Sequence, residues 1–591
     1  MNTQSQEPDH GRSIHFPTDD PVGWVDIRPA LASESSGLSI HGPWESIVDQ
    51  EGWQRLAAAQ GGVRIPPNFE VRLRVHPSAL SDPNAFSRIA PHDIQYLNAI
   101  DSPIKSARLL SLKHLSGLSD LILGGINTPQ RELVHIRHLH SLRHLAVCLP
   151  IWETSDEDLS LLKELKSLER LHMMLPCSID RGLNSLRDMP ELISLGLEDV
   201  LSFTSIGWSQ LCSMRGLHAL SLAGANLSGL TIHDLGGLPG LVALDLSGVI
   251  HDGDVISEIP GLAQIRWLDL TNIHPPLYGE DLQSLNHLPE LRVFKYAQNR
   301  LGSGGLAFLS GLPHLEELNL SNYYRMSFSD TINELRPLSQ CLSLRRLYLG
   351  DRTIGNEEMR RLSGLHELEE LDLFNTSIDD RGLAALRNLV NLRSLNLGAT
   401  HVSDSGMRYL AGLTKMRDLD LTGTSITGAG LGQLGDLKNL RSLSMGGRIR
   451  ISGEDLRELH DFLGLEELSL TGEGVDDTAL RHIGECAGLR RLSIMFATEP
   501  SDGGISSLSS LRHLESLTLS NTQISDRSLG PLLELENLRK LSLDGTGVSD
   551  ASIQSLSQLE GLEELALGGT LVSDEGISRL RKNIPNCVIQ S

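Results

Sequence analysis

One leucine pattern recurs along most of this chain, and it constrains the fold more than any other feature. The pattern reads L-x-x-L-x-x-L-x-L, as at Leu115, Leu118, Leu121 and Leu123. About nineteen copies follow one another at intervals of roughly 24 to 26 residues, and two weaker copies precede them. A fixed period over such a length is the signature of a repeat array. The sequence therefore predicts one continuous stack of repeats. From its length of 591 residues alone, about four separate domains would be expected.

Each repeat divides into a strand, a turn and a short helical segment. The second half of the pattern alternates leucine with other residues, which predicts a short strand whose leucines point inward. Ser-Asp pairs follow, and they place Asp404, Asp526, Asp550 and Asp574 where a carboxylate can accept the free N–H groups at a helix start. Leucines spaced by three residues then predict a short helix or 3₁₀ turn with one buried stripe.

The turn after each strand carries a threonine in the most regular copies, at Thr376, Thr424, Thr522 and Thr546. Its hydroxyl can form a hydrogen bond with neighbouring backbone. Adjacent parallel strands lie about 4.8 Å apart, whereas packed helices need roughly 8–10 Å. We therefore expect the stack to bend, with the strands on its concave side and the helical segments on its convex side.

The fullest copies resemble leucine-rich repeats. Residues 371–383 read LDLFNTSIDDRGL, and residues 400–407 and 570–577 hold related phrases. Over roughly residues 65–591 the chain is similar to the repeats of F-box leucine-rich repeat proteins and of many bacterial ones. This resemblance implies an α/β solenoid, a leucine-rich repeat horseshoe or arc with a parallel β-sheet on the concave face and short helices or 3₁₀ turns on the convex face.

The two ends of the chain depart from the repeat. Residues 1–20 are polar, and we expect a disordered N-terminal tail. Residues 21–64 hold three of the six tryptophans and are expected to cap the array of residues 65–583. A separate small binding module in residues 21–64 is the alternative. Residues 584–591 are predicted to form the C-terminal cap.

Composition and motifs narrow the function. The 51 lysines and arginines against 75 aspartates and glutamates give a net charge of −24, which disfavours binding to nucleic acid. The chain holds no phosphate-binding loop, nucleophile elbow, HExxH or CxxC motif, so no catalytic residue, cofactor or metal is predicted. Six cysteines favour a reducing, cytoplasmic location. With no signal peptide and no run of about 18 apolar residues, no membrane association is expected.

Histidines cluster at His135, His138, His140 and His144, a composition that can bind zinc. The leucine stripe places His135 and His138 on the convex side, whereas His144 lies on a strand and points to the concave side. The four imidazoles then cannot converge on one ion. Solvated surface histidines are therefore favoured over a metal site.

The residues beside the strand leucines point into the concavity, and acidic ones gather on part of it. An acidic groove with interleaved aromatics suits a basic or amphipathic protein segment, because charge gives orientation and aromatics give anchoring energy. The alternative is that these charges only keep a large exposed sheet soluble. Arg346 is also placed to pair with Glu317 or Glu370 and so to weaken the patch. The predicted partner-binding residues are Trp267, Asp269, Glu317, Tyr348, Glu370, Asp372, Phe374, Asp418, Asp420 and Glu467.

One copy of the repeat is longer than the others. It spans roughly 29 residues from Leu312 to Cys341 and carries Tyr323, Tyr324 and Phe328. Insertions in solenoids form loops that are often used for binding. The other interpretation is that these rings fill space beside the edge of a strand.

The favoured function is a non-catalytic protein–protein recognition scaffold that binds a protein partner on its concave face. Its oligomeric state is left open. The resemblance to F-box proteins implies an alternative, a substrate-recognition adaptor of a larger, ubiquitin-ligase-like complex, although no convincing F-box precedes the repeats. A ligase of the bacterial effector type is less favoured because it would need a catalytic domain outside the repeats.

Overall fold

A computed structural model of the protein describes most of the chain in two compact units. The described residues are 12–16, 22–29, 53–75, 84–99, 109–123, 132–147, 159–175, 177–252, 259–278, 281–301, 305–322, 335–447, 451–497, 500–585 and 587–591. Unit 1 consists of Met1–Leu277 and Ser284–Lys295, and unit 2 consists of Tyr278–Gln283 and Tyr296–Ser591.

Unit 1 contains a parallel sheet with an antiparallel start, and a separate two-stranded sheet formed by its first and fourth strands. Its strands are β1 (Ser13–His15), β2 (Gly23–Pro29), β3 (Gln54–Ala58), β4 (Gly62–Arg64), β5 (Phe69–Val75), β6 (Tyr96–Ala99), β7 (Asp120–Leu123), β8 (His144–Val147), β9 (Arg170–Met174), β10 (Ser194–Glu198), β11 (Ala219–Ser221), β12 (Ala243–Asp245), β13 (Trp267–Asp269) and β14 (Val293–Lys295). Strand β2 pairs antiparallel with β3 and β5, and β1 pairs antiparallel with β4. From β5 to β14 each strand pairs in parallel with the next.

Unit 2 contains one parallel sheet in which every strand pairs with the next along the chain. Its strands are β15 (Glu317–Asn319), β16 (Arg346–Tyr348), β17 (Glu370–Asp372), β18 (Ser394–Asn396), β19 (Asp418–Thr422), β20 (Ser442–Gly446), β21 (Glu467–Thr471), β22 (Arg491–Met495), β23 (Ser516–Thr518), β24 (Lys540–Ser542), β25 (Glu564–Ala566) and β26 (Val588–Gln590). The register places leucine beside leucine, as in Leu371, Leu395 and Leu419. All three are buried, as the strand pattern predicts.

Short helical segments connect the strands. The α-helices are α3 (Asp180–Arg187), α4 (Ser205–Leu211), α6 (Asn356–Met359), α7 (Asp380–Leu383), α8 (Asp404–Met407), α9 (Gly428–Leu431), α10 (Asp477–Gly484), α11 (Leu529–Leu532), α12 (Ile553–Leu556) and α13 (Asp574–Asn583). The 3₁₀ segments are η2 (Leu109–Leu112), η3 (Glu132–His135), η4 (Ser160–Glu164), η5 (Ile232–Gly237), η6 (Ile259–Gly261), η7 (Asp281–His287), η8 (Ala307–Gly311), η9 (Arg336–Gln340), η10 (Arg360–Leu362), η11 (Gly432–Leu434), η12 (Gly453–Asp461), η13 (Gly504–Ser510), η14 (Asp526–Ser528) and η15 (Asp550–Ser552). Within the described residues, no helix is long and apolar enough to cross a membrane.

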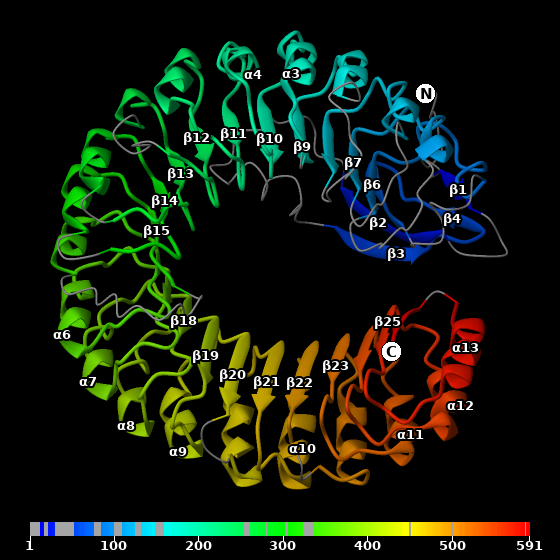
Figure 1. Ribbon diagram of the computed structural model, residues 1–591. Coiled ribbons are helices and arrows are strands. Elements are labelled where there is room, and N and C mark those ends of the chain that lie inside the picture. The colour runs from blue at the N-terminus through cyan, green and yellow to red at the C-terminus, as the bar shows by residue number, and fades with distance from the viewer. Residues whose placement is uncertain are drawn as a thin grey trace, which may run out of the picture. The chain divides into compact units, whose positions relative to one another are not determined.

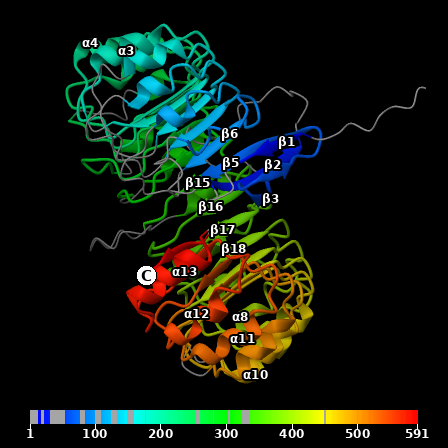
Figure 2. The ribbon, with the colours of Figure 1, turned by 90° about the vertical axis from the view of Figure 1, so that its right-hand side faces the viewer.

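In each unit the strands lie on the concave side and the helical segments on the convex side (Figure 1). Figure 2 shows α3 and α4 together on the outer side of unit 1, and α10 to α13 following one another along unit 2. Between the two layers lies a core of aliphatic side chains, and Leu383, Leu386 and Leu389 from one helical stripe are fully buried in it. The predicted solenoid of parallel strands with short helices or 3₁₀ turns is confirmed.

At the four predicted capping aspartates, the helical segment starts one residue earlier than the sequence predicts. At α8 the N-cap is Ser403, whose extended backbone lets its hydroxyl accept the N–H of Ser405. Asp404 follows with helical backbone geometry, and its side chain reaches the next repeat. There Asp404 accepts the backbone N–H of Thr427 at 2.8 Å and the hydroxyl of the same residue at 2.7 Å.

The same link from carboxylate to the next repeat joins Asp526 to Ser549 and Asp550 to Ser573. At α13 the N-cap is likewise Ser573, not Asp574. The Ser-Asp pair therefore supplies the N-cap as predicted, but through its serine, and the aspartates accept backbone N–H groups of the next repeat instead of those of their own helical segment. A residue in the first helical position directs its side chain back past the helix start, where only a neighbouring repeat offers free donors.

The threonine prediction is confirmed. The hydroxyl of Thr376 donates to the carbonyl of Leu373 at 2.8 Å, and Thr424, Thr522 and Thr546 donate in the same way to the leucine three residues earlier. Each hydroxyl closes the turn that follows its strand.

The N-terminal region shows more order than expected where it is described. Within the predicted disordered tail, residues 12–16 are described and contain strand β1, with Ile14 and Phe16 buried. Within residues 21–64, β2 and β3 extend the sheet beyond β5. The boundaries at residues 65 and 584 stay predictions.

Candidate functional site

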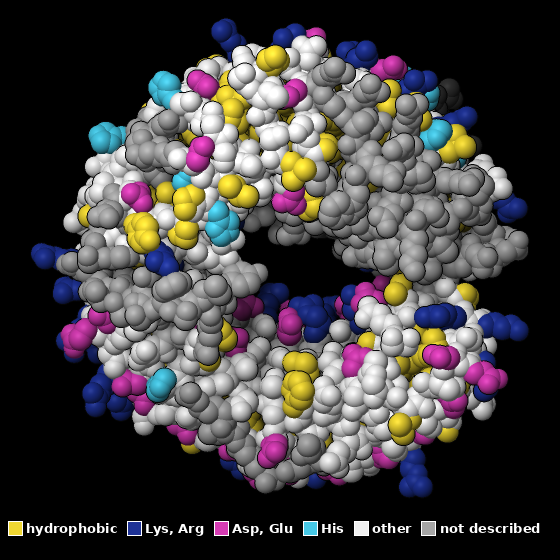
Figure 3. Space-filling model, in the orientation of Figure 1, with side chains coloured by type: hydrophobic (Ala, Val, Ile, Leu, Met, Phe, Trp, Pro, Cys, Tyr) yellow, Lys and Arg dark blue, Asp and Glu magenta, His cyan; other side chains and the backbone are white. Residues whose placement is uncertain are grey.

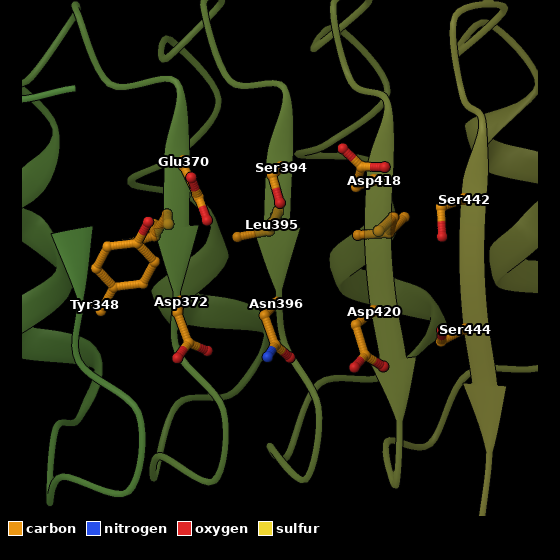
Figure 4. A pocket seen from close by; sticks show the side chains of 12 residues that line it. Tyr348, Glu370, Asp372, Ser394, Leu395, Asn396, Asp418, Asp420, Ser442 and Ser444 are labelled. Atoms are coloured by element: carbon orange, nitrogen blue, oxygen red, sulfur yellow. The ribbon is translucent and has the colours of Figure 1, made fainter. Parts of the chain in front are cut away.

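A hollow of about 300 Å³ opens on the concave side of unit 2 across strands β16 to β20 (Figure 4). We call it the acidic groove. Its lining residues are Tyr348, Glu370, Leu371, Asp372, Ser394, Leu395, Asn396, Asp418, Leu419, Asp420, Ser442 and Ser444. Five of the predicted partner-binding residues, Tyr348, Glu370, Asp372, Asp418 and Asp420, are among them.

The polar side chains of the groove stand in two rows, because every second residue of a strand faces the same side. The parallel register aligns Glu370, Ser394, Asp418 and Ser442 in the first row. It aligns Tyr348, Asp372, Asn396, Asp420 and Ser444 in the second row. Figure 4 shows the side chains of each row next to one another. The carboxylates of β17 and β19 therefore face each other across β18, about 10 Å apart at a strand spacing of about 4.8 Å.

Side chains of the second row also accept hydrogen bonds from the backbone of the turns that follow the strands. Asp372 accepts the backbone N–H of Phe374 at 3.0 Å, and Asp420 accepts that of Thr422 at 2.8 Å. Asn396 makes the same bond to Gly398 at 2.9 Å. One oxygen at each position thus closes an Asx-type turn. Sequence reasoning missed this structural role, although Asp or Asn recurs at this position from repeat to repeat.

The first row holds two carboxylates, of which Glu370 is half-buried and Asp418 is exposed. Burial raises the pKa of the Glu370 carboxyl above its ordinary value, although a hydrogen bond with the Tyr348 hydroxyl acts in the opposite direction. Burial and the nearby Glu467 raise the pKa of Asp418, against the effect of Arg417 and Arg441. A positive group that entered the groove would stabilise the ionised form of both carboxylates.

Two other predicted residues lie beside the groove and are neutralised. Glu317 accepts Arg346 at 2.7 Å, so the predicted pairing of Arg346 with Glu317 is confirmed. Glu467 pairs with Arg491 at 2.8 Å. Neither glutamate lines the groove. Phe374 also lies outside the lining, and its backbone N–H binds Asp372.

Trp267 and Asp269 lie in unit 1, on β13, and not in the groove. The side chain of Trp267 is 3% exposed and belongs to a buried apolar row with Ala219, Ala243 and Val293. The expectation that this ring offers an open contact surface is therefore wrong. The residues beside it on the adjacent strands are Ala243 and Val293, and the ammonium group of Lys295 lies 5.2 Å from the centre of its ring.

Asp269 has a structural role like that of the groove aspartates. It accepts the backbone N–H of Thr271 at 2.8 Å. Burial and the charge of Asp245 on the adjacent strand together raise the pKa of Asp269 to about 7, against the hydrogen bonds from Thr271 and the charge of Lys295.

The remaining candidate residues form no site. Tyr323, Tyr324 and Phe328 lie outside the described residues. His144 is on β8 and binds Asp120 at 2.5 Å, whereas His135 ends η3 on the other side of the repeat. Across the described ranges, no group of three or more His, Cys, Asp or Glu side chains is arranged to hold a metal ion.

Residues 365–386 and 388–411 match the family model described as Leucine Rich repeat. These two segments include strands β17 and β18 of the acidic groove. No curated protein matches the chain closely enough to count as a relative.

Several solved structures resemble the protein. An internalin (inlF) from Listeria monocytogenes is 20% identical, with 60% of this chain and 88% of that one covered and a TM-score of 0.38. The mouse RP105/MD-1 complex gives 17% identity, coverage of 82% and 88%, and a TM-score of 0.47. The plant peptide hormone receptor RGFR1 in complex with RGF2 gives 14% identity, coverage of 89% and 93%, and a TM-score of 0.35. None of these values reaches the level at which a shared shape bears on function.

Proposed function

Because this chain is built from leucine-rich repeats, we propose that it is a non-catalytic recognition scaffold whose acidic groove holds a basic or amphipathic segment of a protein partner. The observation that carries the proposal is the charge of the groove. Its lining includes Glu370, Asp372, Asp418 and Asp420, and none of the twelve lining side chains is a lysine or arginine.

The surroundings of the groove support this choice of ligand. On either side, Arg346 and Arg491 neutralise Glu317 and Glu467, so the acidic groove is bounded by ion pairs. Within the groove, Glu370 is half-buried, and this burial raises the pKa of its carboxyl, whereas the charge of Arg346 on the adjacent strand lowers it. A lysine or arginine side chain of a partner would give this carboxylate an opposite charge within its low-dielectric setting.

Tyr348 and the groove serines supply the rest of a peptide-binding surface. The Tyr348 ring lies at one end of the second row, where it can cover the aliphatic stem of a lysine or arginine (Figure 4). Ser394, Ser442 and Ser444 add small polar side chains that leave room for a bound chain. The groove therefore combines orientation by charge with one aromatic contact.

Affinity capture of a partner tests the proposal. We expect the protein, used under reducing conditions because its described cysteines are free thiols, to retain a partner from a cell extract of its source, and to lose it as salt screens the groove. A cytoplasmic location is part of this proposal.

The decisive comparison uses two variants of equal charge. The double variant Asp372→Asn and Asp420→Asn removes two charges from the groove and keeps side chains that can hold the turns. The control, Glu560→Gln with Glu575→Gln, removes two charges from exposed positions near α13. We expect the first variant to lose the partner and the control to keep it. Equal retention by both would reject the acidic groove as the binding site.

A further inference from the structure

A row of charged residues runs along one rim of the unit 2 sheet, just before the strands begin. We call it the rim row. From Arg345 to Glu563 its members alternate between arginine and glutamate from one repeat to the next, except at one place. There Arg393, Arg417 and Arg441 follow one another. The backbone N–H of each rim residue donates to the carbonyl of the preceding one, for example Arg417 to Arg393 at 2.7 Å, so the row is a true neighbour series.

Where the rim row alternates, neighbouring repeats are joined by ion pairs. Glu369 accepts Arg345 at 2.6 Å and Arg393 at 3.2 Å, and Arg441 pairs with Glu466 at 3.2 Å. The same pairing continues towards β25, as between Arg539 and Glu563 at 3.1 Å. Alternation thus gives each rim residue an opposite charge on the next repeat.

Arg417 breaks this scheme at the acidic groove. Among the described residues it forms no ion pair, and both of its neighbours in the rim row are arginines. Its side chain is exposed. Like charges one strand spacing apart destabilise a sheet, so this position carries an electrostatic cost that a glutamate would avoid. The break lies directly before β19 and its groove residues Asp418 and Asp420.

We infer that the segment bound in the acidic groove has mixed charge, with basic groups over the groove carboxylates and an acidic group against Arg417. This inference rests on the proposed function. Figure 3 shows acidic and basic side chains next to each other on the inner surface of unit 2. Arg417 and Asp420 are three positions apart along the extended chain, which corresponds to about 10 Å. The partner therefore presents opposite charges on one face at a separation of up to about 10 Å, a distance that two turns of helix also span.

Such an arrangement sets direction as well as affinity. A segment with only positive charge could lie in the groove in either orientation. In both orientations the arginines of the rim row repel the end of the segment that lies at the rim. In one orientation, a mixed-charge segment is attracted both by the carboxylates of the acidic groove and by the arginines of the rim row. In the opposite orientation it is repelled by both. The rim row and the groove together therefore select the orientation of the bound chain along the strand direction.

The test compares two fluorescein-labelled peptides by anisotropy at low salt. One is a short peptide of alternating lysine and glycine, and the other is the same peptide with a pair of glutamates at one end. We expect the wild-type protein to bind both and to prefer the mixed-charge peptide by about two- to fivefold, the range of an exposed ion pair.

Arg417→Glu is the decisive variant because it completes the alternation of the rim row and so is expected to fold. It should reverse the preference, with tighter binding of the basic peptide and weaker binding of the mixed one. Arg417→Gln should fall between the two proteins. A wild-type protein that binds the basic peptide without preference for the mixed one overturns this inference alone. Failure to bind either peptide overturns the proposed function as well.

Discussion

Replacing Asp420 separates the two roles that its carboxylate has in the groove. One oxygen accepts the backbone N–H of Thr422 at 2.8 Å, while the charge faces the hollow. Asparagine occupies the same position in two other repeats, where Asn396 accepts the N–H of Gly398 at 2.9 Å and Asn319 that of Ser321 at 3.0 Å. Asp420→Asn should therefore keep the turn and remove the charge, whereas Asp420→Ala should remove both.

The expected magnitudes follow from these contacts. For Asp420→Asn the free energy of unfolding should change by no more than about 0.5 kcal/mol, as for a surface substitution that retains its hydrogen bond. Asp420→Ala leaves a partly buried N–H without its acceptor and should cost about 1 to 2 kcal/mol. Both variants should bind the basic peptide about two- to fivefold more weakly, since both lose one partly exposed charge.

Urea denaturation and hydrogen exchange together measure the loss of stability that follows when the turn loses its hydrogen bond. The unfolding midpoint should fall for Asp420→Ala at an unchanged m-value, and exchange at the Thr422 amide should accelerate. The turn role is refuted if asparagine destabilises the protein as much as alanine does. The charge role is refuted if the asparagine variant binds the basic peptide as tightly as the wild type.

Further predictions concern the core, the links between repeats and the rim. Leu395→Ala should cost about 2–5 kcal/mol of unfolding free energy and Ser394→Ala at most about 0.5 kcal/mol; equal costs in urea titrations would contradict the assigned faces of β18. Hydrogen bonds from the hydroxyl and the backbone N–H of Ser573 lower the pKa of Asp550. The contribution of this link to the stability of the folded protein is therefore complete above the ordinary carboxyl pKa of about 4, and it is lost as the pH falls through the lowered pKa. Ser573→Ala should reduce this acid-side loss in unfolding measured across pH, and an unchanged pH profile would speak against the link. Arg417→Glu should raise the unfolding free energy by up to about 1 kcal/mol, and a decrease would mean that the rim arginines do not repel one another.

The period of the leucines was enough to predict the strands, the buried face and half of the site. Since side chains alternate along a strand, a leucine such as Leu395 that is known to point inward fixes the outward direction of Ser394 and Asn396. The same argument placed Tyr348 and the groove carboxylates on one surface. The stacking of adjacent repeats in register also predicted that Arg346 pairs with Glu317 or Glu370, and the structure shows the pair with Glu317.

Other features depend on geometry finer than the period. The N-cap is Ser403 and not Asp404, because the backbone changes from extended to helical between these two residues. The burial of Trp267 depends on its place in one row with Ala219, Ala243 and Val293, which only the stacked register reveals. The turn-closing bond of Asp420 likewise needs the backbone path after the strand.

Hydrogen exchange with and without the basic peptide tests most directly whether the acidic groove is where a positively charged segment binds. The account predicts slower exchange at the turn amides that the second row holds, those of Phe374, Gly398 and Thr422. It also predicts that the Asp372→Asn and Asp420→Asn double variant loses this protection. Protection that falls elsewhere in the protein, or that persists in the double variant, would contradict the account.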